Sequence, residues 1–160
     1  MASRSSPQNP RLLAGALALL RVFVGVKFLL AGMQKWDWIG THRLADILTG
    51  WAAANASLAY ARFLTQTVIP HESLFTYLVV LGEIGVGALL ILGLFTRLAA
   101  LLALIMSANY LLAVWHIGPA SQGYNESFLA MEAAVVLTGA GRRFGLDARL
   151  ARKHPGWLLW

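Results

Sequence analysis

Four long apolar stretches divide the chain, at about residues 12–36, 74–95, 97–116 and 126–141. Each approaches the ~20 residues that an α-helix needs to cross a hydrocarbon layer of about 30 Å. All five prolines fall outside these stretches, as expected where loops rather than helix interiors hold the helix-breaking residues. The pattern predicts an all-α integral membrane protein, a four-helix transmembrane bundle that forms one domain over residues 1–160.

The segment between the first two stretches, residues 37–73, is too long for a simple turn. Within it Leu44, Ile47, Leu48 and Trp51 recur at helical spacing. We expect one or two amphipathic helices in this outer loop, lying on the surface of the bundle with aromatic side chains in the membrane interface. Such a loop either closes the bundle as a lid, or admits a substrate or docks a partner.

Composition agrees with a membrane protein. Of the 160 residues, 58% are hydrophobic and 12% are charged, against about 25% charged residues in a typical soluble domain. Cysteine is absent, which removes disulfides, thiolate metal sites and a thiol nucleophile. The net charge of +6 comes from basic residues that flank the apolar stretches, which argues for contact with membrane lipid and against nucleic-acid binding.

The basic residues also predict an orientation. Arg97 lies between the second and third stretches, and a basic tail occupies residues 142–160. By the positive-inside rule we expect both termini to be cytoplasmic. The apolar run after Arg4 and Arg11 has the pattern of a secretory signal, but the apolar character resumes after Arg21, so we predict an uncleaved first span.

Charged side chains inside the apolar stretches are the most informative polar feature. Arg21 and Lys27 lie in the first stretch, Glu83 in the second and Glu132 in the fourth. A charge at the bilayer centre costs roughly 3 kcal/mol on insertion scales, so such residues usually face the bundle interior and find partners. At a rise of about 1.5 Å per residue, these four and Asn109 fall in one layer. We predict that Glu132 pairs with Arg21, and that Glu83 lies between Arg21 and Lys27.

Two interpretations of this layer stay open. The charges can be interhelical ties that only set the register of the bundle. Alternatively, together with Asn109 and Tyr110 they form a network that holds a polar ligand or relays protons. Arg21 and Lys35 share one basic face of the first helix, whereas Lys27 lies on another.

The four histidines do not indicate a haem or a metal site, because no two of them are expected to face each other at equal depth in the membrane. We therefore predict neither haem nor protein-bound metal. His116, at the outer end of the third stretch, is a candidate proton-exchanging group. An ordinary interfacial histidine is the alternative.

Three segments resemble the DoxX/DoxD family of four-helix membrane proteins: LLRVFVGVKFLLAGMQKW, GEIGVGALLILGLFTRLAAL and the closing GAGRRFGLD. The Gly82-Glu83 pair, the segment 93–97 and the ending 141–147 are fairly specific together. The family includes the small DoxD-type subunit of thiosulfate:quinone oxidoreductase. The resemblance thus implies a bacterial or archaeal cytoplasmic membrane, and electron transfer from thiosulfate, or another reduced sulfur species, to a diffusible membrane quinone, with thiosulfate oxidised to tetrathionate.

The resemblance also suggests roles for the polar residues. We expect Arg21, Lys35 and Glu83 to be catalytic, with the two cations forming a path for the anion. The residues expected to bind or protonate the quinone are Lys27, Asn109, Tyr110, His116 and Glu132. Since the sequence shows no obvious redox centre, electrons either pass within one site or use a cofactor held by a partner subunit.

Two other classes of protein stay open. One is a non-catalytic accessory subunit, packed through glycine-rich helix faces on a larger respiratory or photosynthetic membrane complex. The other is a small anion transporter or channel, which unbroken helices without an inverted repeat support poorly.

Overall fold

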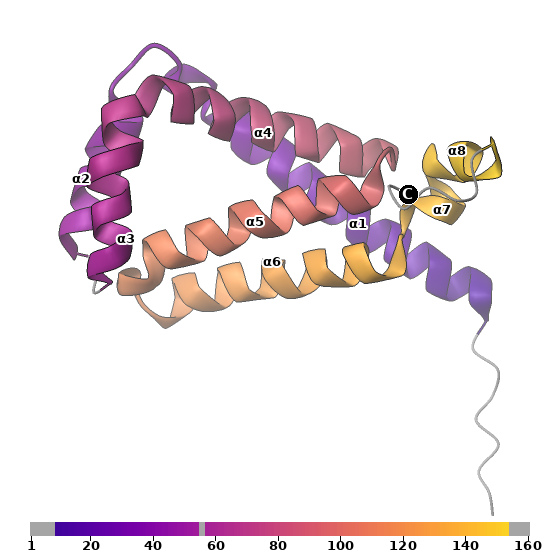
Figure 1. Ribbon diagram of the computed structural model, residues 1–160. Helices are drawn as coiled ribbons and strands as arrows, with labels where there is room; N and C mark the ends of the chain where they lie inside the picture. Colours follow the sequence, from indigo (N-terminus) through magenta and orange to yellow (C-terminus); the bar gives the residue numbers. More distant parts are fainter. Residues whose placement is uncertain (1–8, 55–56, 154–160) are drawn as a thin grey trace, which may run out of the picture.

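The structure, a computed structural model, describes residues 9–54 and 57–153, and within these ranges it contains helices and no strand. Four long helices run lengthwise beside one another (Figure 1). They are α1 (Pro10–Gln34), α4 (Glu72–Leu92), α5 (Thr96–Val114) and α6 (Pro119–Thr138). α1 lies against α4, α4 against α5, α5 against α6, and α6 returns to α1. The four predicted helices therefore form, each within a few residues of its expected bounds except at the start of α6.

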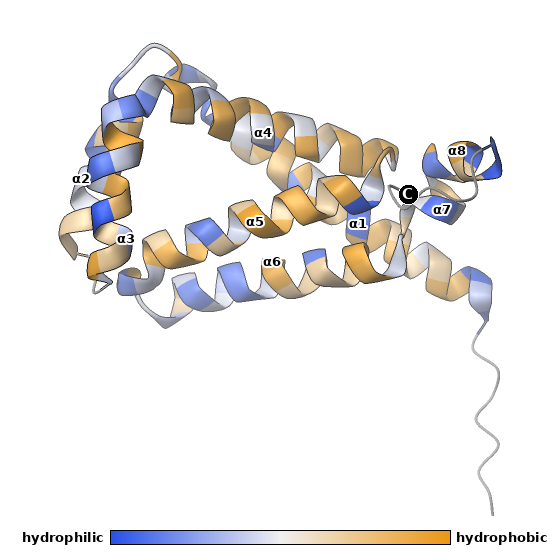
Figure 2. Cartoon of the chain, viewed as in Figure 1, coloured by the Kyte–Doolittle hydropathy of each residue, from blue (hydrophilic) through white to orange (hydrophobic). Residues whose placement is uncertain are grey.

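Three segments of the described chain are long and apolar enough to cross a membrane: Pro10–Trp38, Leu58–Leu92 and Thr96–Ile117. Figure 2 shows apolar residues along most of α1, α4 and α5, whereas the first half of α6 is largely hydrophilic. The chain is thus a multi-pass membrane protein, and its described part is all-helical with three candidate spans. A membrane crossing by α6 stays a prediction.

Glycines set the register of α1 against α4. A Cβ atom built on Gly25 would lie 2.9 Å from the carbonyl oxygen of Gly87, and one built on Gly87 would lie 2.5 Å from the backbone nitrogen of Leu29. One built on Gly32 would lie 3.0 Å from the Cβ of Glu83. Because only glycine leaves room for this approach, Gly25 faces Gly87 and Gly32 faces Glu83.

The outer loop folds as predicted into helices. α2 (Arg43–Ala54) and α3 (Leu58–Phe63) lie across one end of the long helices, and a π-helical turn, Leu64–Val68, leads back towards α4 (Figure 1). We call residues 43–71 the cap. Its buried side chains form a hydrophobic cluster of their own, distinct from the cluster between the long helices.

At the opposite end, which we call the tail end, the chain closes with α7 (Gly141–Phe144) and α8 (Asp147–Lys153). The buried Asp147 carboxylate accepts hydrogen bonds of 2.8 Å from the backbone nitrogens of Phe95 and Thr96. The Asp147 nitrogen donates to the carbonyl oxygen of Gly93, at 2.9 Å. These bonds hold Phe95 in a left-handed conformation (φ 48°) that non-glycine residues seldom adopt, and so fix the turn between α4 and α5.

Candidate functional site

A partly buried ion pair lies where α1, α4 and α5 meet near the cap. The Lys35 ammonium donates to both carboxylate oxygens of Glu83, at 2.5 and 2.7 Å. The Tyr110 hydroxyl donates to the same carboxylate at 2.7 Å. The Glu83 side chain is 1% exposed and that of Lys35 22%. We call these three residues the Lys35–Glu83–Tyr110 network.

The helix register explains why these residues meet. Gly32 brings the backbone of α1 against Glu83, and Lys35 follows one turn later, just past the end of α1. From there its long side chain reaches back over the carboxylate. The ammonium also lies 5.5 Å from the ring centroid of Tyr110 and 5.9 Å from that of Trp38, where aromatic faces stabilise a cation.

A cavity of about 360 Å³ lies between the cap and the helices α4 and α5. Most of its wall is aromatic or aliphatic, with Trp38, Trp51, Phe63 and Phe75 among the larger side chains. Its polar groups come from Lys35, Tyr60, Asn109 and Tyr110. We call it the larger cavity. A mostly apolar cavity with a few converging polar groups is the usual form of a small-molecule site.

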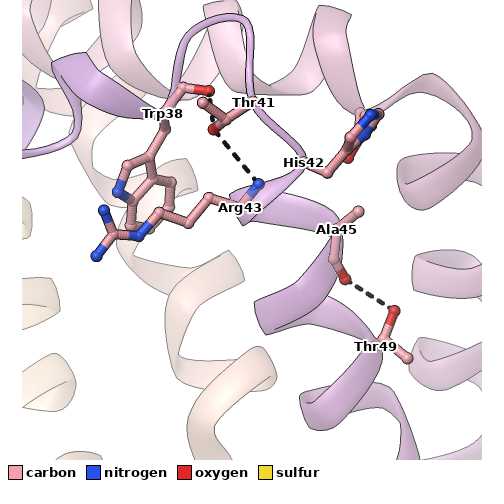
Figure 3. Close-up of polar contacts among 7 residues, drawn as sticks. Trp38, Thr41, His42, Arg43, Ala45 and Thr49 are labelled. Atoms are coloured by element: carbon pink, nitrogen blue, oxygen red, sulfur yellow. Dashed lines mark hydrogen bonds and ion pairs between the residues drawn. The ribbon is translucent and has the colours of Figure 1, made fainter.

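Hydrogen bonds hold the cap and the turn before it around this cavity. The Tyr60 hydroxyl on α3 donates to the side-chain oxygen of Asn109 on α5, at 2.7 Å. At the other side, Trp38 belongs to the turn that precedes α2. The Thr41 hydroxyl donates to the Trp38 carbonyl at 2.8 Å and accepts from the Arg43 nitrogen at 3.5 Å (Figure 3). The turn therefore holds an aromatic wall of the cavity in place.

A second cavity, of about 170 Å³, lies between α1, α5 and α6. Lys27, Glu83, Ser107 and Asn125 contribute polar side chains to it. Lys35 and Tyr110 line both cavities. We call it the smaller cavity. The Lys35–Glu83–Tyr110 network is thus the partition between the two.

The partition can donate hydrogen bonds and move protons. An ammonium has three N–H groups, and Lys35 uses two of them on Glu83, so one remains for a ligand. The Tyr110 hydroxyl lies at the wall of the larger cavity with a carboxylate behind it. A ligand oxygen that gains negative charge there would meet the Lys35 ammonium, and Glu83 and the Tyr110 hydroxyl are placed to exchange protons with it.

The structure corrects the predicted pairings. Glu83 pairs with Lys35 rather than with Arg21 or Lys27, and Glu132 accepts a hydrogen bond of 2.7 Å from the Ser107 hydroxyl rather than pairing with Arg21. The reason is that the start of α1 extends past the end of α4 (Figure 1). The predicted depth of Arg21 was counted from the beginning of α1, and it therefore placed Arg21 too deep in the bundle.

Arg21 lies at the tail end instead. The residue is 2% exposed, and its guanidinium packs against Gly93 and Gly145 and donates to the carbonyl oxygen of Phe144 at 2.8 Å. In the register of α1 on α4, Gly93 is ten residues beyond Glu83, about 15 Å along the helix. Arg21 thus lines neither cavity, and its expected part in an anion path with Lys35 has no geometric support.

Of the remaining predicted residues, three line a cavity and two do not. Asn109 and Tyr110 line the larger cavity, and Lys27 lines the smaller one. Glu132 is fully buried and reaches the smaller cavity only through Ser107. His116, in the turn after α5, lines neither cavity.

Sequence reasoning missed three contributors. Tyr60 and Trp38 form part of the larger cavity, and Ser107 links Glu132 to the smaller one. For Tyr60 the sequence offers one signal, the amphipathic pattern of the outer loop. That pattern predicts that Tyr60 lies near the membrane interface, but it does not predict which helix Tyr60 contacts. Within the described ranges, no three His, Cys, Asp or Glu side chains gather as metal ligands would.

Comparison with known proteins gives one family. The DoxX family model matches residues 16–116, a span that contains Lys35, Glu83, Asn109 and Tyr110. All of α6 and the tail-end helices lie beyond the match. No curated protein and no solved structure matches this chain.

Proposed function

The chain belongs to the DoxX family, and from this premise we propose that it is a membrane redox protein that binds a quinone in the larger cavity. The electrons would come from thiosulfate or another reduced sulfur anion. The observation that carries the proposal is an apolar, aromatic cavity with the Lys35 ammonium and the Tyr110 hydroxyl in its wall.

The residues of the cavity fit a quinone in shape and chemistry. A quinone has a flat ring, two carbonyl oxygens that accept hydrogen bonds, and an apolar tail. Trp38, Trp51 and Phe63 offer aromatic faces for the ring. Lys35 offers its remaining N–H to one carbonyl oxygen, and the Tyr110 hydroxyl, which donates to Glu83, lies beside it in the wall. The exposed leucines of the surrounding helices would leave the tail in lipid.

The reaction balances with two protons. Two thiosulfate ions join through a new sulfur–sulfur bond to give tetrathionate and release two electrons, and the quinone takes two electrons and two protons to become a quinol. Lys35 would stabilise the charge that develops on the quinone oxygen, and Glu83 and the Tyr110 hydroxyl would pass protons to it. The residues of this chain would therefore bind the quinone, orient it and supply its protons.

We further propose that α6 is a fourth span and that both termini are cytoplasmic. α6 has 20 residues, about 30 Å of helix, and packs along α5 and α1. A reporter fused after Trp160 should be active only inside the cell, and one inserted between Ala54 and Ser57 only outside. The opposite pattern would overturn the orientation. If both reporters are active on the same side of the membrane, α6 does not cross it, and the fourth span is overturned.

The function is tested on purified protein in nanodiscs with a short-chain quinone. Binding is measured by quenching of tryptophan fluorescence, and turnover by thiosulfate-dependent loss of quinone absorbance. Tyr110→Phe should lower turnover at least tenfold, because it removes the hydroxyl and leaves the ring. Tyr77→Phe is the matched control, since Tyr77 is an exposed tyrosine on α4 that lines neither cavity.

The same assay separates the alternatives. Wild-type protein that binds no quinone would overturn the proposal. So would protein that binds quinone without reducing it and purifies in fixed stoichiometry with a larger membrane complex, which is the accessory-subunit outcome.

A further inference from the structure

We propose that the smaller cavity is a binding site for a small anion, with Lys27 as its principal cation. The inference rests on the proposed function only where it identifies this anion with the electron donor. The geometry behind it is a lysine that has no partner among the described residues and that lines a cavity with several polar side chains, and this cavity shares Lys35 and Tyr110 with the larger one.

Lys27 is the first part of the argument. It lies within the apolar span of α1, where a charge is costly. Within residues 9–54 and 57–153 no hydrogen bond or ion pair holds its ammonium, and the side chain is exposed while also lining the smaller cavity. A cation that has no fixed countercharge in such a place is suited to binding a diffusible anion.

Hydrogen-bond donors converge on the same space. Lys27 has three N–H groups to offer, and the Lys35 ammonium adds a second positive charge to the wall of the cavity. The buried Asn125 amide donates one N–H to the carbonyl oxygen of Ser121, at 2.9 Å, which leaves its second. Donors from α1 and α6 thus surround the cavity on two sides.

The charge balance also favours an anion. Lys27, Lys35 and Glu83 are the charged residues that line the smaller cavity. Glu83 is the one carboxylate among them, and it is already bound by Lys35 and by the Tyr110 hydroxyl. Glu132 lies behind Ser107 and does not line the cavity. The net charge facing the space is therefore positive.

The size sets an upper limit on the ligand. A cavity of about 170 Å³, at about 30 Å³ for each water molecule in the liquid, holds a small tetrahedral anion and some water but no large organic anion. Phe28 and Phe128 close it on the apolar side. Thiosulfate and sulfate both satisfy this limit.

The position of the site has a chemical consequence. An anion in the smaller cavity and a quinone in the larger one would both contact Lys35 and Tyr110, from opposite sides of the partition. A donor and an acceptor held this close need no long chain of cofactors between them. The main rival explanation is that Lys27 extends along the helix to a lipid headgroup.

The test is calorimetric titration of the purified protein with thiosulfate, repeated with sulfate and with no quinone present. Lys27→Gln should weaken thiosulfate binding roughly tenfold or more, because a charge-assisted hydrogen bond is lost, and Lys27→Arg should retain most of the affinity. Lys153→Gln, an exposed lysine of α8, is the matched control and should bind as wild type does. Gel filtration and the melting temperature verify that each variant is folded.

The outcomes are distinct from those of the proposed function. Lys27-dependent binding of thiosulfate supports the inference even if no quinone is reduced, and in that case the proposed function alone fails. Equal affinities of Lys27→Gln and wild type, or no binding of either anion to wild type, would overturn the inference. Binding of both anions with equal affinity supports an anion site that does not select thiosulfate.

Discussion

The cap end and the tail end of the long helices both bury charged side chains, yet they use them differently. At the tail end Asp147 binds two backbone nitrogens, and Arg21 packs against glycines and donates to a backbone carbonyl oxygen. At the cap end Lys35 and Glu83 bind each other, and both line a cavity. Burial of a charge therefore does not by itself mark a ligand site. What distinguishes the two ends is whether the charged group faces backbone or open space.

The largest effect is expected from breaking the tail end. Asp147→Ala removes the acceptor for the nitrogens of Phe95 and Thr96 and leaves Arg21 without its nearest countercharge. We expect a loss of about 3 kcal/mol in the free energy of unfolding, measured by denaturation in detergent.

The control for this change is Asp46→Ala, at an exposed position on α2. Quinone affinity, measured on the fraction of Asp147→Ala that remains folded, should stay at the wild-type value. A specific loss of quinone affinity would show that the two ends are coupled.

A change in the helix register should disturb both ends together. Gly87→Ala places a methyl group within 2.5 Å of the backbone nitrogen of Leu29, and we expect a loss of about 2 kcal/mol in stability together with weaker quinone binding. Gly85→Ala, on the same helix with no atom within 4 Å of the added carbon, is the control. A tolerated Gly87→Ala would disprove the role of the glycines in setting the register.

Within the cap end, a change at the ion pair should affect binding more than folding. Glu83→Gln keeps the shape but removes the charge that faces Lys35, and we expect about 1 kcal/mol of lost stability because the partly exposed Lys35 is still reached by water. Turnover should fall far more than stability does. Glu126→Gln, on the exposed face of α6, provides the comparison. If both properties of Glu83→Gln match this control, the network is not a functional site.

The smallest effect is expected at the link between cap and helices. Tyr60→Phe removes the hydrogen bond to Asn109, worth about 1 kcal/mol or less. Amide hydrogen exchange in α2 should quicken, while exchange in α5 near Thr96 should not. Faster exchange at both places would mean that the cap does not open on its own.

The sequence allowed the helices to be predicted because long apolar stretches are a strong signal. The exception is the start of α6, which begins at Pro119 rather than near residue 126. Its first turns carry polar residues, so a prediction based on apolar length began too late. Proline at the first helical position after Gly118 was the signal for this start.

The residues of the site were easier to predict than their partners. Lys35, Glu83 and Tyr110 stand out as polar groups in or beside apolar stretches, but which of them meet depends on the contact of Gly32 with Glu83, and that register is not visible in one sequence. The segments 93–97 and 141–147 are a clearer case. They were singled out as separate motifs, and the structure shows that they bind each other through Asp147.

The separate hydrophobic cluster of the cap bears on the timing of ligand exchange. Leu44, Leu48 and Leu64 pack within the cap rather than into the core between the long helices. Local opening of the cap would then cost only the free energy of that small cluster and of its link to Asn109, and not that of global unfolding. The residence time of a molecule in the larger cavity would be set by a few leucines. Substitutions among them would lengthen or shorten it while the melting temperature of the protein stayed nearly constant.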